Sequence, residues 1–194
     1  MTTKKTIVLL GVLIAGLVIN SEEMNKVKVG EFLLSTEGWE LNLGKEFPGA
    51  EGNLWWEEEE GCAAKGAASL EGNFASGGNY VSMVRFFPEK YNIKGLSFQI
   101  RTKDLTSVIL RLVDSTNQTF QVKIPLKDTT EWQNVNFDIS NLVPGKFMVA
   151  WGGAGDGQWH GPAKGMSILI DKGCFKFKDN KKGLILIDDV ELIR

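Results

Sequence analysis

Residues 118–124, Gln-Thr-Phe-Gln-Val-Lys-Ile, alternate polar and apolar side chains and place Phe120, Val122 and Ile124 on one side. A period of two is typical of a β-strand with one face on a core and the other in solvent. The same alternation recurs in residues 95–101 and 132–139. These runs therefore predict strands of antiparallel sheets.

Other runs are apolar almost throughout, which favours strands near the middle of a sheet: residues 108–113, 147–151, 166–170 and 184–187. Segments rich in Gly, Asn and Asp separate these runs and predict turns. No stretch after residue 24 shows sustained helical periodicity. About nine or ten strands spaced in this way predict an all-β fold, an antiparallel two-sheet β-sandwich or jelly roll, over residues 28–194.

The composition fits this fold class and excludes one class of partner. The chain has 194 residues, which suits one domain with a substantial core. It contains 11 Phe, 6 Trp and 22 Gly, a balance that favours β-structure. Its formal net charge is −2, so there is no surplus of Lys and Arg to neutralise phosphates. We therefore expect no nucleic-acid partner.

Residues 1–22 have the layout of an export signal. Lys4 and Lys5 precede an apolar stretch, residues 7–19, and polar residues follow. This order predicts a secretory signal peptide, and the stretch is short for a membrane-spanning helix, which needs about 20 apolar residues. No small-x-small cleavage site is evident, so an uncleaved N-terminal anchor is the alternative. We expect a secreted, periplasmic or cell-surface protein that meets a membrane only through this segment, if it is uncleaved.

Two cysteines, Cys62 and Cys174, lie far apart in the sequence. In an oxidising compartment a disulfide between them would close a long loop and stabilise the fold. Two free thiols are the alternative, because the sequence does not show whether the residues come within bonding distance. The disulfide is thus one of two hypotheses.

Residues 151–162, Trp-Gly-Gly-Ala-Gly-Asp-Gly-Gln-Trp-His-Gly-Pro, form the most informative stretch for function. Glycine lets a loop fold tightly and brings backbone groups close to a ligand. A Trp side chain offers a flat apolar face against which the C–H surface of a sugar ring packs. Trp151 or Trp159 is therefore a candidate stacking platform.

Polar side chains in and near this loop are candidates for bonding sugar hydroxyls. Asp156 and the only histidine, His160, lie within the loop, and Asn79 belongs to a second glycine-rich segment. Tyr80, next to Asn79, is either a second stacking residue or part of the core. For the loop as a whole, the alternative is a structural turn whose aromatic side chains cover the core.

At this point the sequence resembles a known group of domains. Five segments occur in an order similar to that of accessory β-sandwich domains of bacterial glycoside hydrolases: residues 77–81, 114–120, 131–133, 151–162 and 187–192. These domains are non-catalytic carbohydrate-binding modules of the galactose-binding-domain-like group. The similarity spans about residues 30–194, and residues 151–162 are its most specific part. The resemblance implies a β-sandwich that binds carbohydrate, with a glycoside hydrolase as a further partner. An envelope protein is the partner expected if the domain serves in protein interaction instead.

The resemblance also implies a structural calcium site. In related modules an acidic residue of the last strand joins one from the N-terminal region and backbone carbonyls. Here Asp188 or Asp189 would supply the first and Glu31 or Glu37 the second. Oxygen ligands suit Ca²⁺. Judged from the residues alone, solvated carboxylates are the alternative, and no other cofactor is expected.

Signatures of catalysis are weak in this sequence. Residues 57–60 are four consecutive Glu, which we interpret as a solvated run that strand alternation divides between two faces. No GxSxG motif accompanies the single histidine, and there is no phosphate-binding loop. Arg85, Arg101 and Arg111 lie in β-prone runs. They are either contacts to a saccharide or ordinary charged positions on outer faces.

The preferred hypothesis is a non-catalytic, extracytoplasmic protein that binds a polysaccharide or oligosaccharide through its aromatic, glycine-rich loop. A structural or protein-interaction domain of the cell envelope is the alternative from a different class. A small jelly-roll glycoside hydrolase or lyase is the third hypothesis.

Overall fold

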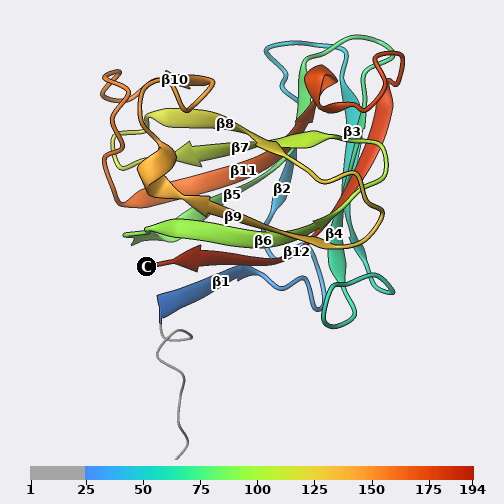
Figure 1. The fold of residues 1–194 in the computed structure, drawn as a ribbon, viewed down its shortest axis with the longest axis horizontal. Helices are drawn as coiled ribbons and strands as arrows, with labels where there is room; N and C mark the ends of the chain where they lie inside the picture. The colour runs from blue at the N-terminus through green and yellow to red at the C-terminus, as the bar shows by residue number, and fades with distance from the viewer. Residues whose placement is uncertain (1–24) are drawn as a thin grey trace, which may run out of the picture.

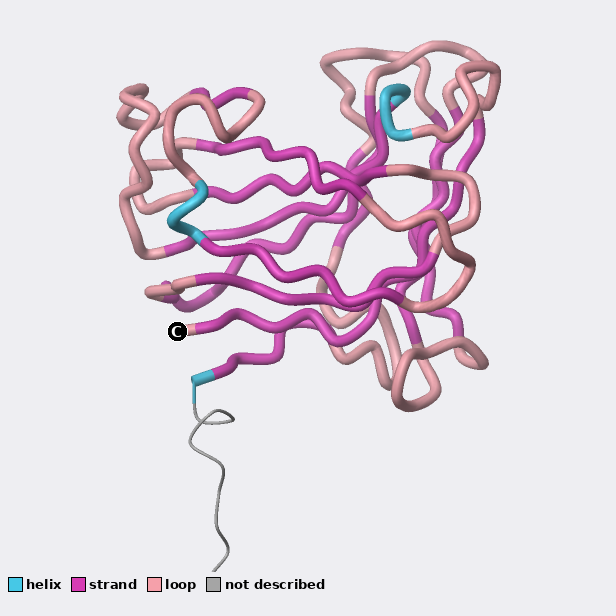
Figure 2. Tube along the Cα trace, viewed as in Figure 1, coloured by secondary structure: helices cyan, strands magenta, loops and turns pink. Residues whose placement is uncertain are grey.

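Alternating apolar side chains build the core of the computed structural model, which describes residues 25–194. Phe98 and Ile100 from one sheet and Leu112, Phe120 and Ile168 from the other are buried together between the layers. The predicted inward face of residues 118–124 is confirmed at Phe120 and Val122. Figures 1 and 2 show the result, two layers of antiparallel strands that pack face to face.

Sheet A contains six strands and holds the last strand at its centre. Its order in space is β3 (Glu51–Glu57), β4 (Ala67–Asn73), β12 (Lys182–Ile193), β6 (Gly95–Arg101) and β9 (Gln133–Asp138), and β1 (Lys26–Gly30) pairs with the second half of β12. The backbone N–H of Arg194 donates to the carbonyl of Asn25 over 2.7 Å. Both ends of the described chain therefore lie at one edge of sheet A.

Sheet B also contains six strands. Their order is β10 (Val149–Trp151), β8 (Thr119–Pro125), β7 (Ser107–Val113), β11 (Ala163–Asp171), β5 (Tyr80–Tyr91) and β2 (Glu40–Asn42). Two short 3₁₀ helices complete the fold, η2 (Ile139–Asn141) and η3 (Lys172–Cys174). The predicted all-β, two-sheet sandwich is confirmed.

Details differ from the sequence-based expectation. The structure has twelve named strands, more than predicted, and β1 begins at Lys26, before the predicted boundary at residue 28. Residues 57–60 do not alternate between two faces, because β3 ends at Glu57 and the following residues form a turn. Of residues 147–151 only the last three form a strand, since β10 pairs with β8 alone at the edge of the sheet.

The predicted signal peptide or anchor, residues 1–22, lies outside the described residues. Within residues 25–194, no helix is long and apolar enough to cross a membrane.

Candidate functional site

Strand pairing collects polar side chains at the centre of the outer face of sheet B. Arg111 on β7 lies opposite Gln121 on β8 and Ser167 on β11. These positions alternate with buried Leu110 and Leu112, so their side chains point away from the core. The register of three strands thus places an arginine in the middle of a solvent-facing surface.

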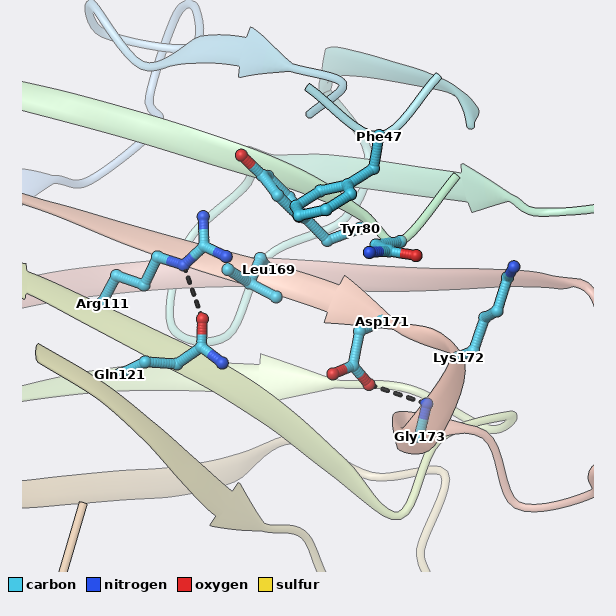
Figure 3. Close-up of a pocket in the computed structure, with 9 residues that line it drawn as sticks. Phe47, Tyr80, Arg111, Gln121, Leu169, Asp171, Lys172 and Gly173 are labelled. Carbon is cyan, nitrogen blue, oxygen red and sulfur yellow. Dashed lines mark hydrogen bonds between the residues drawn. The ribbon is translucent and has the colours of Figure 1, made fainter. Parts of the chain in front are cut away.

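Two aromatic rings fix the guanidinium of Arg111. Its Cζ lies 4.1 Å from the ring centroid of Tyr80 and 5.3 Å from that of Trp151. Its Nε donates to Oε1 of Gln121 over 2.8 Å, as Figure 3 shows. Stacking of a cation on aromatic faces and a directed hydrogen bond both restrict rotation. The guanidinium is therefore held in place before any ligand arrives.

A pocket of about 350 Å³ opens beside this arginine. Leu169 and Asp171 of β11 lie along its floor, and Figure 3 shows the rings of Phe47 and Tyr80 together above them. Phe47 comes from the loop between β2 and β3 and is 46% exposed. The pocket is lined by Phe47, Asn79, Tyr80, Arg111, Gln121, Leu169, Asp171, Lys172 and Gly173.

Charges of both signs line or border the pocket. The hydroxyl of Tyr80 donates to Oε1 of Glu46 over 2.6 Å, and this bond lowers the pKa of Glu46. Burial, followed by the same bond, raises the pKa of Tyr80, so this ring stays a neutral phenol. Asp171 accepts a hydrogen bond from the backbone N–H of Gly173 over 2.7 Å. With Arg111 present as well, the pocket offers several fixed donors and acceptors around apolar rings.

The structure separates the two tryptophans that the sequence proposed as platforms. Trp151 is 42% exposed on β10, next to Arg111. Trp159 is half-buried instead and packs against the core, with its ring centroid 5.7 Å from that of Phe120. Of the two, only Trp151 adjoins the pocket. Asn79 and Tyr80 line the pocket directly.

Asp156 and His160 do not line this pocket, because their polar atoms bind other parts of the loop. Oδ1 of Asp156 accepts from the N–H of Gln158 over 2.9 Å, and Oδ2 lies 2.9 Å from Nε2 of His160. The backbone bond is the larger of the effects that lower the pKa of Asp156 to about 2. These predicted ligand contacts thus form an internal brace for residues 151–162.

Buried Asp114 fastens this loop to the turn between β7 and β8. Its Oδ1 accepts from the N–H and the hydroxyl of Thr116 and from the N–H of Gln118. Its Oδ2 accepts from the N–H of His160 over 3.2 Å. Gly153 adopts a positive φ close to the same turn, where a Cβ would lie 2.2 Å from the nitrogen of Gln118. Glycine is therefore required at position 153 by close packing of the two loops.

The disulfide hypothesis for Cys62 and Cys174 is wrong for this structure, which contains both residues as free thiols. Cys62 is exposed in the loop between β3 and β4, where its N–H donates to Asp188. Cys174 is buried in η3, which follows β11 of the other sheet. The two residues follow strands of different sheets.

Three of the carboxylates predicted to bind calcium have hydrogen-bond or ion-pair partners among the described residues. Glu31 pairs with Lys28, and both carboxylate oxygens of Glu37 accept backbone N–H groups. The oxygens of Asp188 accept from the N–H groups of Cys62 and Asp189. No three His, Cys, Asp or Glu side chains within residues 25–194 are placed to hold a metal ion. Calcium binding stays a prediction from resemblance alone, without support from these side chains.

Several pocket residues were not predicted from the sequence: Phe47, Gln121, Leu169, Asp171 and Lys172. Arg111 did carry a signal, because it is the only charged residue in the otherwise apolar run 108–113. Arg85, which looks equivalent in sequence, donates to the carbonyl of Val29 instead. Arg85 lies opposite buried Met166 on the inner side of sheet B, whereas Arg111 lies opposite Ser167 on the outer side.

Comparison with known proteins identifies no relative by sequence. No protein-family model matches the chain. No curated protein sequence matches it either.

Solved structures, however, share its fold. The family 11 carbohydrate-binding module of a cellulosomal cellulase of Clostridium thermocellum aligns with a TM-score of 0.59 and 13% identity, over 87% of this chain and 94% of that one. The Clostridium thermocellum family 11 module in complex with a β-1,3-1,4-mixed-linked tetrasaccharide gives a TM-score of 0.60, 13% identity and coverage of 87% and 95%.

A third structure, described as showing promiscuous specificity of carbohydrate-binding modules from the β-sandwich superfamily, gives a TM-score of 0.50 and 10% identity, over 81% of this chain and 57% of that one. The chain therefore has the fold of the β-sandwich carbohydrate-binding modules.

Proposed function

We propose that this protein binds a polysaccharide or oligosaccharide on the outer face of sheet B and does not cleave it. The observation that carries the proposal is the guanidinium of Arg111, which stacks on Tyr80 and Trp151 beside a pocket of about 350 Å³. A sugar ring has apolar C–H faces and a rim of hydroxyls. Aromatic rings next to a fixed fork of N–H donors match both surfaces.

The contacts divide into apolar and polar ones. Exposed Phe47 lines the pocket, and exposed Trp151 offers a ring face next to Arg111. Gln121 and Asp171 supply an amide and a carboxylate within the same pocket. The site is largely preformed and open to solvent. These properties are typical of a ligand-binding site, whereas a catalytic site often closes to exclude water.

The electrostatics argue against Glu46, which borders this pocket, as a glycosidase general acid. A glycosidase general acid needs a raised pKa so that it carries a proton near neutral pH. The hydrogen bond from Tyr80 shifts Glu46 in the opposite direction and lowers its pKa. A carboxyl group held as its anion accepts hydrogen bonds from hydroxyls but does not protonate a leaving group.

Two similarities support this proposal. The chain shares its fold with carbohydrate-binding modules, and one of those structures contains a β-1,3-1,4-mixed-linked tetrasaccharide. The basic and apolar N-terminal sequence supports a place outside the cytoplasm, where polysaccharides are met. Fractionation of cells that express the full chain tests this location, and a purely cytoplasmic protein would contradict it.

Binding is tested by affinity electrophoresis and calorimetry against soluble mixed-linkage β-1,3-1,4-glucan, xylan and mannan. We expect retention by at least one of them. Arg111→Ala should weaken binding about 10- to 100-fold, as loss of a central interface arginine does. Arg194→Ala is the matched control, because Arg194 stacks on Tyr91 and does not line the pocket. No binding by the folded protein, or equal binding by the two variants, contradicts the proposal.

A further inference from the structure

Two leucines face outward from the middle of sheet A. Leu184 and Leu186 alternate along β12 with Ile185 and Ile187, which are fully buried in the core. Leu184 is half-buried, whereas Leu186 is only 9% exposed. An antiparallel sheet with one solvent-facing side normally carries polar residues on that side. Apolar side chains in this position are therefore a feature to explain.

A straight cross-strand row passes through one of these leucines. Leu186 pairs with Ser69 of β4 on one side and with Arg101 of β6 on the other, and Ser69 pairs with Trp55 of β3. At the far end, Cζ of Arg101 lies 5.2 Å from the ring centroid of Trp132, just before β9. The row thus runs from one tryptophan to another across the outer face of sheet A.

A pocket of about 240 Å³ opens on this row. Leu184 and Leu186 form its apolar side, and Arg101 lies beside them. The Nη2 of Arg101 donates to Oε2 of Glu60, and this is the only side-chain hydrogen bond of Arg101 to the part of the chain that the structure describes. The pocket is lined by Glu60, Arg101, Thr102, Lys103, Thr130, Leu184 and Leu186.

This arrangement repeats the chemistry of the pocket on sheet B. Each site has an arginine that stacks on a tryptophan, Arg111 with Trp151 and Arg101 with Trp132. Each also has a leucine in the pocket lining and a carboxylate beside the arginine or its aromatic partner. Because the two sheets pack face to face and each site is on the outer face of its sheet, the sites lie on opposite sides of the molecule.

We propose that the outer face of sheet A is a second saccharide site, so that one chain holds two glycan chains on opposite faces. This inference rests on the function proposed for sheet B, since both sites would take the same class of ligand. The free N–H donors of Arg101 and the ammonium of Lys103 bond sugar hydroxyls, and Leu184 and Trp132 pack against the ring. A molecule with two opposed sites bridges polysaccharide chains.

Amide NMR of the full chain tests this site directly. The probes are β-1,3-1,4-mixed-linked tetrasaccharide, xylotetraose and mannotetraose, added separately. We expect two groups of shifted amides with at least one probe, around residues 101–103 and 184–186 and around residues 111 and 169–173. Arg101→Ala should weaken only the first group, about tenfold or more. Arg111→Ala should weaken only the second, and Arg194→Ala neither.

The cross-linking of polysaccharide chains by a protein with two sites gives a second, independent measurement, the turbidity of the solution. Wild-type protein should raise the turbidity of soluble mixed-linkage β-glucan, xylan or mannan, whereas Arg101→Ala and Arg111→Ala should each abolish this effect. Leu184→Glu, which puts a charge at a half-buried position of the pocket, serves as a second variant if Arg101→Ala does not fold.

The two proposals fail in different ways. Binding that is lost in Arg111→Ala and unchanged in Arg101→Ala and Leu184→Glu overturns the second site and leaves the function of sheet B in place. A folded protein that binds no probe overturns both.

Discussion

The two tryptophans of the 151–162 loop have different roles, although they are residues of the same type in one short segment. Trp151 is 42% exposed beside Arg111, whereas Trp159 packs on Phe120. They are eight positions apart in one glycine-rich segment. The sequence therefore offers both as platforms, and only the packing assigns one to the surface and the other to the core.

Trp151→Ala should reduce saccharide affinity about tenfold and change the free energy of unfolding by less than about 0.5 kcal/mol. Trp159→Ala should instead cost roughly 2–3 kcal/mol of stability, because it removes a large half-buried ring from the core. Chemical denaturation and calorimetry on both variants check the contrast. Equal loss of stability in the two variants contradicts it.

The pKa of Asp156 should lie well below that of an ordinary aspartate. The N–H of Gln158, then the His160 side chain, lower its pKa to about 2. Because the folded pKa is depressed, the stabilisation from these bonds is present above the ordinary value of 3.8 and disappears as the pH falls through about 2. Carboxyl ¹³C NMR measures this titration directly. In His160→Ala the pKa should move back toward the ordinary value, and an unshifted wild-type resonance would disprove the brace.

At the scale of elements, the loop and turn that flank Trp151 depend on one buried carboxylate. Asp114 accepts hydrogen bonds from residues of its own turn and from His160 of the other loop. Asp114→Ala leaves these donors without their partner, which should cost about 2–4 kcal/mol. Urea denaturation measures the loss. Asp104→Ala, an exchange in the neighbouring β6–β7 connection, is the control and should have little effect.

The strands themselves were largely predictable from sequence, and the site only in part. Asn79, Tyr80 and Trp151 were candidates from the sequence, but Phe47, Gln121 and Asp171 were not. Polar and apolar side chains alternate in residues 118–124 and 132–139 because one face of each strand is buried, and this pattern can be read from the sequence alone. Strands β8 and β9 form there. The pocket gathers Tyr80 from β5, Arg111 from β7 and Asp171 from β11. Their meeting depends on the order of strands in sheet B, which pairing sets and periodicity does not encode. The resemblance pointed to the correct fold. In the loop that carried it, Asp156 and His160 bond to each other, while Trp151 lies beside Arg111.

At the scale of the whole molecule, stability should depend on pH through Asp188. Burial raises the pKa of this carboxyl group to about 6. The N–H groups that bond to it lower its pKa, and the negative charges of Asp189 and Glu37 raise it. Protonation of Asp188 therefore stabilises the folded state. This stabilisation is fully present below the unfolded pKa of 3.8 and is lost as the pH rises through about 6. Allowing for solvent screening, the loss should be roughly 1–2 kcal/mol. Denaturation in EDTA at pH 5 and pH 7.5 measures it, and Asp188→Asn should flatten the profile.

The fold as a whole should not depend on a cross-link. Both cysteines are free thiols, and burial raises the pKa of Cys174 to about 11. Exposed Cys62 should therefore react with a thiol reagent in the native protein, and Cys174 only after unfolding. A reducing agent should leave the melting temperature unchanged. A drop of several degrees on reduction would show that a disulfide exists.

The contact between the backbone of Arg194 and Asn25 has a consequence for attachment. Since Asn25 and Arg194 lie at the same edge of sheet A, a tether attached at either residue leaves from that edge and covers neither broad face. The same closeness makes the described residues suited to circular permutation, with a short peptide joining Asn25 to Arg194 and new ends opened at exposed residues 177–179 between β11 and β12.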